Sequence, residues 1–348
     1  MSPLGFCPPF LVLALVALGA RLGGGWTFAA FLAAPLCLAG LDAALGDDTG
    51  DLPPRGEAAY RQLPLLYVLL QLAVTGWLAV RVSRVELPAL EFIGLVLSNG
   101  LATGIFGFVA AHELIHSRRP GERAAGLVLL GSAFYMHFAI AHVHGHHRRA
   151  ATRDDPASAR LGESLYAFLP RSIAGQLAES WAFEAQRLRR RGRAVAGPGN
   201  RVLIYLALEG LLALAVGLAS LRALGFLAAG ALVAILLLEA FNYIAHYGLA
   251  RDASGRVERL GPKHAWNTAR RINNRALFNM GRHSDHHGST MRPYHRLETP
   301  PGAPQLPAGY AGMILLALVP PLWRRVMDPR ARAVGAASSG PGTFTASP

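Results

Sequence analysis

Long apolar stretches separated by short polar segments dominate the N-terminal two thirds of the chain. A membrane-spanning helix needs about 20 mostly apolar residues, and six stretches come close to this length. The first is short and is joined to the second by a tight Arg-Leu-Gly-Gly-Gly connection, which predicts a hairpin of two helices. The pattern therefore predicts an all-α, polytopic membrane protein with about six transmembrane helices, at 7–22, 26–45, 63–82, 89–111, 202–222 and 224–246.

Two further apolar segments are less suited to crossing a membrane. Residues 124–141 are apolar enough to be buried, and we predict a re-entrant or interfacial helix there. Residues 309–323 are broken by a pair of prolines, so we interpret them as an interfacial segment. The chain ends in the low-complexity sequence GAASSGPGTFTASP, which is typical of disorder. We predict one membrane domain over residues 1–325 and a disordered tail over residues 326–348.

The distribution of charged residues predicts which side of the membrane each polar stretch faces. Lysine and arginine outnumber aspartate and glutamate by 34 to 21, and most arginines lie in the polar stretches 142–200 and 250–306. Basic segments are retained on the cytoplasmic side of a membrane, so we predict that both stretches face the cytoplasm from a cell inner membrane. The loops at 46–62 and around Arg81 and Arg84 favour the opposite orientation, but the total bias outweighs them. A basic chain can bind nucleic acid, but the apolar runs favour a membrane and no nucleic acid.

Thirteen histidines are present, and nine of them lie in three clusters, of which all except His144 have related spacing. HELIH and HVHGHH each contain two histidines four residues apart, which share one face of a helix and suit one metal. An adjacent His-His pair lets the neighbouring ring reach a second metal. All three clusters lie at the predicted cytoplasmic ends of apolar segments or in the polar stretches beside them. The clustered histidines with related spacing are His112, His116, His142, His146, His147, His283, His286 and His287.

The clusters favour a site for two metal ions over several alternatives. HELIH, with Glu113 in second place, resembles the H-E-x-x-H motif of zinc proteases, but such a site has one zinc and three protein ligands. A non-enzymatic metal transporter would need ligands near the membrane midplane, and a solvated histidine-rich loop explains one cluster better than three. Imidazole suits zinc, copper, iron and nickel alike, so the residues alone leave the metal open. The two cysteines, Cys7 and Cys37, exclude a four-cysteine zinc site and an iron–sulfur ligand set.

Acidic residues near the clusters are candidates for orienting the metal ligands. A ligand histidine is neutral, and its second ring nitrogen usually donates to a carboxylate or a carbonyl. For Asp154 and Asp155, a helix cap or turn before Pro156 is the alternative. His246, which ends the last apolar stretch in FNYIAHYGL, is by itself typical of a buried core histidine. The candidate orienting residues are Glu113, Asp154, Asp155, Glu239 and Asp285.

Five motifs, taken in order, resemble one known family: HELIHSRR, HGHHRRAATRDDPAS, NYIAHYGL, HAWN and RHSDHH. They are similar to the integral-membrane alkane 1-monooxygenases and their xylene side-chain hydroxylase relatives, within the membrane fatty-acid desaturase superfamily. The resemblance implies a non-haem diiron enzyme that uses O2 and electrons to hydroxylate an unactivated C–H bond, often a terminal methyl, of an alkane or alkyl chain. A lipid or fatty-acyl desaturase or hydroxylase of the same superfamily is the main alternative, but desaturases generally lack the NYxxHYG motif.

The resemblance also implies which residues bind the two iron ions. Carried over position by position, the implied ligands are His112, His116, His142, His146, His147, His246, His283, His286 and His287. The chain departs from the family at Ala141 and Ala245, where relatives usually carry a glutamate that would orient the neighbouring ligand. We predict that the variant Ala245→Glu folds and keeps iron. The remaining histidines, expected to be structural or to support the ligands, are His137, His144, His264 and His295.

A separate electron carrier is the last implied partner. With two cysteines, the chain has no cysteine pairs to hold the iron of a fused rubredoxin, which implies a separate rubredoxin or ferredoxin with its reductase. Such carriers are commonly acidic, so the basic run formed by Arg187, Arg189, Arg190, Arg191 and Arg193 is a candidate for steering one by charge. Alternatively, these arginines only set the topology and contact anionic lipid. A channel buried among the helices would hold the hydrocarbon, which prefers an apolar environment to water.

Overall fold

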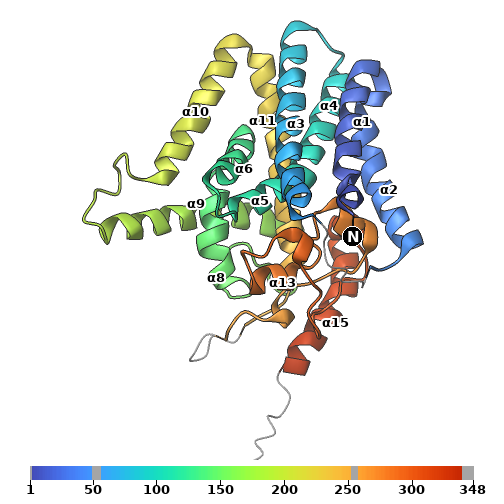
Figure 1. The fold of residues 1–348 in the computed structure, drawn as a ribbon, viewed down its shortest axis with the longest axis vertical. Helices are drawn as coiled ribbons and strands as arrows, with labels where there is room; N and C mark the ends of the chain where they lie inside the picture. Colours follow the sequence, from blue (N-terminus) through green and yellow to red (C-terminus); the bar gives the residue numbers. More distant parts are fainter. Residues whose placement is uncertain (1, 49–55, 252–257, 339–348) are drawn as a thin grey trace, which may run out of the picture.

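The computed structural model describes residues 2–48, 56–251 and 258–338, and its regular elements in these ranges are all helices. Long helices gather at one end of the molecule, and the short helices and loops of the C-terminal third lie at the other end (Figure 1). This architecture confirms the all-α prediction. Most of the acidic loop expected after the second apolar stretch lies outside the described residues.

Five helical segments are long and apolar enough to cross a membrane, and they agree closely with the predicted stretches. A sixth apolar helix, α1 (Pro8–Leu22), has only 15 residues. The chain is therefore a multi-pass membrane protein. The five spans are Gly24–Leu45, which comprises η2 (Gly24–Phe28) and α2 (Ala29–Leu45), then α3 (Glu57–Arg84), Ala89–Ile115, α10 (Arg201–Ala219) and α11 (Leu221–His246).

The span Ala89–Ile115 is one continuous helix with a widened turn in its middle. It comprises α4 (Ala89–Leu101), the π-helical segment η3 (Ala102–Gly107) and α5 (Phe108–Ile115). A side chain at Gly104 would lie 2.6 Å from the backbone carbonyl oxygen of Ala234 in α11, so glycine lets these two helices approach closely. π-helical turns often occur at functional sites, and this one leads directly into the HELIH segment.

The predicted hairpin of α1 and α2 is held together by close backbone contact. Gly23 follows the last residue of α1 with a positive φ of 71°, a conformation that glycine adopts without steric cost. A side chain at Gly19 would lie 2.3 Å from the carbonyl oxygen of Trp26, so a larger residue there would push the hairpin apart. The Ser98 hydroxyl of α4 donates to the Thr27 carbonyl at 2.7 Å, which fixes the hairpin against the neighbouring span.

Apart from α10 and α11, the elements that follow α5 lie outside the candidate spans. Their sequence predicted a buried helix around 124–141, and the structure has α6 there, followed by a turn and short helical segments. The long helix α9 was not predicted, because its sequence is too polar to suggest a span. These elements are α6 (Pro120–Ser132), α7 (Phe138–Ile140), η4 (Ala141–His146), α8 (His147–Arg149), α9 (Leu165–Arg189), η5 (Pro262–His264), α12 (Arg271–Ala276), α13 (His283–Gly288), η6 (Tyr294–Arg296), α14 (Tyr310–Ala317) and α15 (Pro320–Ser338), with η1 (Pro3–Phe6) at the start of the chain.

A buried carboxylate joins α9 to α10. Glu184 accepts hydrogen bonds from Arg187 and Arg201, each at 2.6 Å. Burial raises the pKa of Glu184, but the hydrogen bonds from the two arginines outweigh this effect and lower the pKa to about 2. Arg187 is therefore committed to an ion pair within the protein, which separates it from the other arginines of the basic run.

The C-terminal helix α15 extends further than the sequence suggested. The expected break at the proline pair is present, because Pro320 begins α15 just after α14 ends. Met327 and Ala331 are nonetheless buried, and the Tyr247 hydroxyl donates to Asp328 at 2.6 Å. The first part of the expected disordered tail, up to residue 338, is thus a docked helix, and residues 339–348 lie outside the described residues.

Candidate metal centre

The structure brings all nine expected metal ligands together beneath the long helices. They come from five elements that are far apart in the sequence: the end of α5, η4, α8, the last residue of α11, and α13. Within each of two groups, one ring nitrogen of every member lies within 4.8 Å of those of the others. The five-histidine group is His112, His116, His142, His147 and His286, and the four-histidine group is His146, His246, His283 and His287.

Local helix geometry explains why neighbouring histidines enter different groups. His142 and His147 are five residues apart and both join the five-histidine group, with their Nε2 atoms 2.9 Å apart. The π-helical turn of η4 hydrogen-bonds residue i to i+5, and this brings positions five apart to the same side. His283 and His287, four apart on α13, both join the four-histidine group, with Nε2 atoms 3.1 Å apart.

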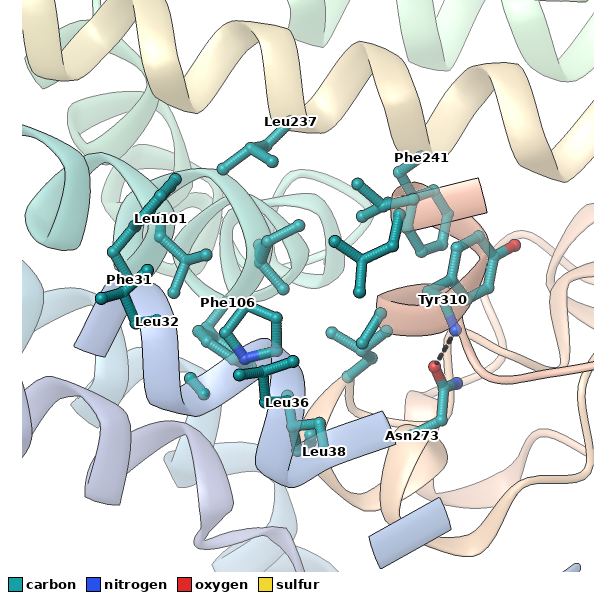
Figure 2. A pocket seen from close by; sticks show the side chains of 18 of the residues that line it. Phe31, Leu32, Leu36, Leu38, Leu101, Phe106, Leu237, Phe241, Asn273 and Tyr310 are labelled. Carbon is teal, nitrogen blue, oxygen red and sulfur yellow. Dashed lines mark hydrogen bonds between the residues drawn. The ribbon is translucent and has the colours of Figure 1, made fainter. Parts of the chain in front are cut away.

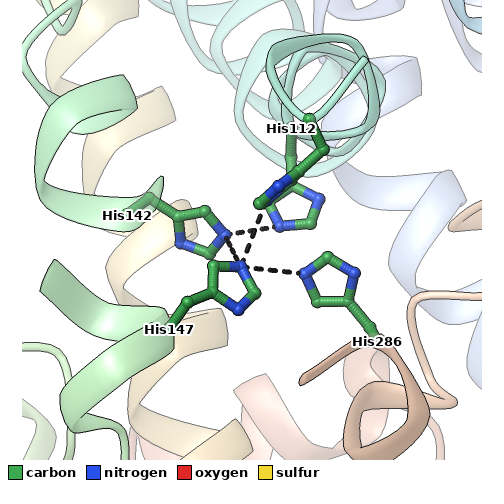
Figure 3. Close-up of side chains that lie close together, drawn as sticks. His112, His142, His147 and His286 are labelled. Carbon is green, nitrogen blue, oxygen red and sulfur yellow. Dashed lines mark hydrogen bonds between the residues drawn. The ribbon is translucent and has the colours of Figure 1, made fainter. Parts of the chain in front are cut away.

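The Nε2 atoms of the five-histidine group converge on one point, as Figure 3 shows for four labelled rings. His147 Nε2 lies 2.9 Å from His142 Nε2, 3.1 Å from His116 Nε2 and 3.2 Å from His286 Nε2. A neutral imidazole carries one N–H donor, so a single nitrogen cannot hydrogen-bond to three other rings at once. Converging ring lone pairs are instead the arrangement that a cation requires, and these residues therefore fit a metal ion.

The ring nitrogens of the four-histidine group converge in the same way. His246 Nε2 lies 3.2 Å from the Nε2 atoms of both His283 and His287, and His146 Nε2 is buried without a hydrogen-bond partner among the described residues. Burial, reinforced by the neighbouring histidines, lowers the pKa of His283 and His287 well below the usual value. The rings of His283 and His287 are therefore neutral at pH 7, which is the state that a metal ligand needs.

Two rings of the four-histidine group are anchored through their second nitrogen. His146 Nδ1 lies 2.8 Å from Asp155 Oδ2, which also accepts a hydrogen bond from the Ser158 hydroxyl at 2.6 Å. Burial raises the pKa of Asp155, but the contacts with His146 and Ser158 outweigh it, and the net pKa is lowered. The His246 ring donates from Nδ1 to the His264 carbonyl oxygen at 2.9 Å. Each bond directs Nε2 toward the metal position.

The other four expected orienting carboxylates have different partners. Glu113 accepts from the Tyr294 backbone N–H at 3.2 Å, and Asp285 accepts from Arg292 at 2.8 Å. Glu239 accepts from the hydroxyls of Tyr135 and Ser172, and Asp154 is exposed. A carboxylate that is next to a histidine in the sequence need not point toward it, because successive side chains of a helix point about 100° apart. Glu113 therefore faces a different element from His112.

The backbone of His264 is a functional element that the sequence analysis missed. Trp266 holds the HAWN segment against the end of α11, because its backbone N–H donates to the Ala245 carbonyl at 2.8 Å and its indole N–H to the Tyr247 carbonyl at 2.9 Å. These bonds position the His264 carbonyl beside His246. The motif had been noticed in the sequence, but a role carried by a backbone atom leaves no signature in residue type.

Two apolar cavities lie beside the metal centre. The larger has a volume of about 430 Å³ and is enclosed by α2, α4, α11 and α14 (Figure 2). The smaller has a volume of about 20 Å³ and is lined by His112 and His142 of the five-histidine group and His283 of the four-histidine group, with apolar side chains around them. We call them the apolar chamber and the metal-facing space. A hydrocarbon fits the first, and only a small group fits the second.

Comparison with known proteins identifies relatives of the chain. Residues 87–314 match the family model described as fatty acid desaturase. Alkane 1-monooxygenase 1 of Pseudomonas aeruginosa is 42% identical over 303 residues, which cover 85% of this chain and 79% of the relative. Alkane 1-monooxygenase of Pseudomonas putida is 37% identical over 83% of this chain and 74% of its own length. The xylene/toluene monooxygenase hydroxylase component XylM of Pseudomonas putida is 34% identical over 76% of this chain and 70% of its own length.

Proposed function

The chain belongs to the fatty acid desaturase family, among the alkane 1-monooxygenases, and we propose that it is a membrane monooxygenase that hydroxylates alkyl chains with O2 at two iron ions. The observation that carries this proposal is the convergence of nine histidine rings in two adjacent groups beside an apolar chamber. The overall reaction would be R–CH3 + O2 + 2 electrons + 2 H+ → R–CH2OH + H2O.

The nine histidines would hold the iron ions, five rings around one and four around the other. When bound, the two iron ions would supply the activation of O2 that no protein side chain provides. Asp155 and the His264 carbonyl would keep two of the rings in the tautomer that presents Nε2 to the metal. The surrounding protein keeps the site dry, because all nine ligands are buried except the partly buried His147.

The apolar chamber supports an alkyl substrate that arrives from the lipid. Its lining includes Leu32 and Leu36, which are more than half exposed on the candidate membrane span that contains α2, and the partly exposed Leu315 of α14. A hydrocarbon gains about 25 cal/mol for each Å² of apolar surface removed from water, so binding in this chamber needs no charged anchor. A chain end could extend from it toward the metal-facing space.

The size of the metal-facing space favours hydroxylation of a chain end over desaturation within a chain. A desaturase must hold an internal pair of carbons beside the metals, with chain continuing on both sides. The space of about 20 Å³ has room for one small group. A terminal methyl fits this room, whereas a chain that passes through does not.

We propose that electrons arrive from rubredoxin or ferredoxin at a basic cleft on α9, facing the cytoplasm from the inner membrane. The cleft has a volume of about 380 Å³ and is lined by Arg149, Arg189 and Arg190 together with Glu179, which pairs with Arg149. Arg149 is two residues from His147, so a carrier docked here would be close to the metal centre. The exposed arginines suit an acidic partner.

Metal analysis and product analysis together test the proposed function. Protein purified with iron should contain two irons per chain and convert members of a panel of alkanes, alkylbenzenes and fatty acids when supplied with rubredoxin, its reductase and O2. His286→Ala should abolish turnover. His295→Ala is the matched control, because His295 is also buried but stacks on Tyr60 at 4.8 Å instead of joining either group. One zinc per chain, or no hydroxylated product from any substrate, would overturn the proposal.

A further inference from the structure

The apolar chamber and the metal-facing space are neighbours that share two lining residues, Ile105 and Phe241. Ile105 lies in the π-helical turn η3, and Phe241 lies in α11 between the two cavities. A hydrocarbon that moves directly from the chamber into the metal-facing space would therefore pass these two side chains. Phe241 is the larger of them and is only 7% exposed.

The Phe241 ring is held in one orientation by an aromatic stack. It lies face to face with Tyr310 of α14, with ring centroids 3.9 Å apart and an interplanar angle of 8° (Figure 2). Its other neighbour is the ring of the metal-group residue His283, whose centroid is 5.9 Å away at 73°. The backbone of Tyr310 is held by its N–H, which donates to the Asn273 side-chain oxygen at 2.8 Å.

The volumes of the two cavities indicate how much of a hydrocarbon chain can reach the metals past the Phe241 ring. The chamber has about 430 Å³ and the metal-facing space about 20 Å³. A cavity needs roughly 10–15 Å³ to admit a group as small as a water molecule, so the space beyond Phe241 admits one methyl-sized group. If the ring were absent, its volume would join the two cavities, and more of the chain could approach the metals.

We propose that Phe241, held in position by Tyr310, is the residue that determines specificity for the chain end. It admits only the terminal carbon of an unbranched hydrocarbon to the metal-facing space and keeps the following carbons in the chamber. This inference rests on the proposed function, because it concerns the substrate of that same reaction. The volume of the Phe241 side chain limits how far a hydrocarbon reaches into the metal-facing space. Tyr310 is a positioning residue that acts through Phe241.

Product analysis with dodecane is the first test. The wild-type protein should give 1-dodecanol, and Phe241→Ala should add 2- and 3-dodecanol. Apolar pocket contacts discriminate by about 10- to 200-fold, so we expect the ratio of secondary to primary alcohol to rise at least about tenfold. Phe241→Leu keeps more volume, should fold where the alanine variant does not, and should give an intermediate ratio. An unchanged ratio in both variants would overturn the proposal.

Two further variants separate this role from a general packing effect. Tyr310→Leu removes the stack and should shift the ratio in the same direction, whereas Tyr310→Phe keeps the ring and should shift it less. Phe226→Ala is the matched control, because Phe226 is also a buried phenylalanine of α11 but packs on Phe92 with ring centroids 6.1 Å apart. An equal shift in Phe226→Ala would show that loosening α11 is sufficient and would contradict the role of Phe241.

A labelling experiment on metal-free protein tests the same inference without turnover. A dodecane with a diazirine at carbon 3, photolysed in the wild-type protein, should label the chamber near Leu315 and leave Met280 of the metal-facing space weakly labelled, because the proposal keeps carbon 3 in the chamber. Phe241→Ala should increase the labelling of Met280 several-fold. Equal labelling of Met280 in both proteins would overturn the inference. If the wild type makes no alcohol from any substrate, the proposed function fails, and the labelling pattern still shows whether Phe241 limits the depth of a bound chain.

Discussion

The two histidine groups differ in how the protein holds their rings. In the four-histidine group, His146 and His246 are anchored through Nδ1 by Asp155 and by the His264 carbonyl. In the five-histidine group, the Nδ1 atoms of His112 and His147 are buried without a hydrogen-bond partner among the described residues. Their rings are held by packing, with the His112 and His142 centroids 4.4 Å apart. One group is thus oriented partly by hydrogen bonds and the other mainly by ring contacts.

The difference between anchored and unanchored rings corresponds to which rings line the metal-facing space. Among the described residues, the metal-facing space is lined by His112, His142 and His283, and not by the anchored rings of His146 and His246. The Nδ1 atoms of His112 and His283 have no hydrogen-bond partner in this part of the chain. Two of the three rings that line the metal-facing space thus lack a partner at Nδ1 among the described residues, and the two rings that have one do not line it.

Removal of one ring from each group should have the largest effect. We expect His147→Ala and His246→Ala both to abolish turnover, because each removes a ligand from one proposed iron. Iron content should fall from two per chain toward one in each variant, which metal analysis by mass spectrometry measures. His295→Ala should retain both irons, since its ring contacts neither group. A His246 variant that keeps two irons would contradict the assignment of His246 as a ligand.

The second largest effect should come from loss of the carboxylate that anchors a histidine ring, with the ring itself unchanged. Asp155→Asn removes the charged partner of His146, and loss of such a partner typically weakens metal affinity by about 10- to 100-fold. We expect one of the two irons to bind more weakly in a chelator competition, with the other unchanged. Asp154→Asn is the matched control, because Asp154 is the exposed neighbour in the sequence. If both variants bind iron equally well, packing alone is sufficient to hold the four-histidine group.

The fold and the ligand set could be predicted because both depend on periodic or repeated patterns. Apolar length predicted the candidate spans, and the spacing of HELIH, HVHGHH and HSDHH indicated eight candidate ligands that the structure brings together. The expectation that His142 and His146 share one metal was wrong, because the π-helical turn η4 places them in different groups. His246 could not be recognised from its surroundings in the sequence, because a single histidine in an apolar run is typical of a core residue. Only its resemblance to a family motif marked it as a ligand.

The orienting groups and the cavities were harder to predict for a physical reason. Of five expected carboxylates, only Asp155 contacts a ligand ring in the described structure, because a side chain's direction depends on the packing of its helix. The His264 carbonyl is a backbone group that any residue type could supply. The stack of Phe241 on Tyr310 joins α11 to α14, and such a contact between distant segments leaves no local pattern in the sequence.

A carboxylate added beside an anchored ring should have a smaller effect than loss of the anchor. Ala245 is fully buried, and its carbonyl accepts a hydrogen bond from Trp266. We expect Ala245→Glu to fold and keep both irons, because His246 Nδ1 is already occupied by the His264 carbonyl. Overpacking should lower the free energy of unfolding by about 1–3 kcal/mol, seen as a lower melting temperature. Complete loss of iron would show that position 245 contacts the ligand set more directly than its backbone role suggests.

The smallest effect on the metals should come from the basic cleft, which lies outside both groups. Arg189→Gln together with Arg190→Gln should leave iron content unchanged and slow turnover by a few fold at low salt, because steering by surface charges falls with ionic strength. The slope of rate against salt concentration should become flatter. Arg330→Gln with Arg332→Gln on α15 provides a control with the same loss of charge on another element. Equal slowing in the two double variants would indicate that net charge, and not this cleft, attracts the electron carrier.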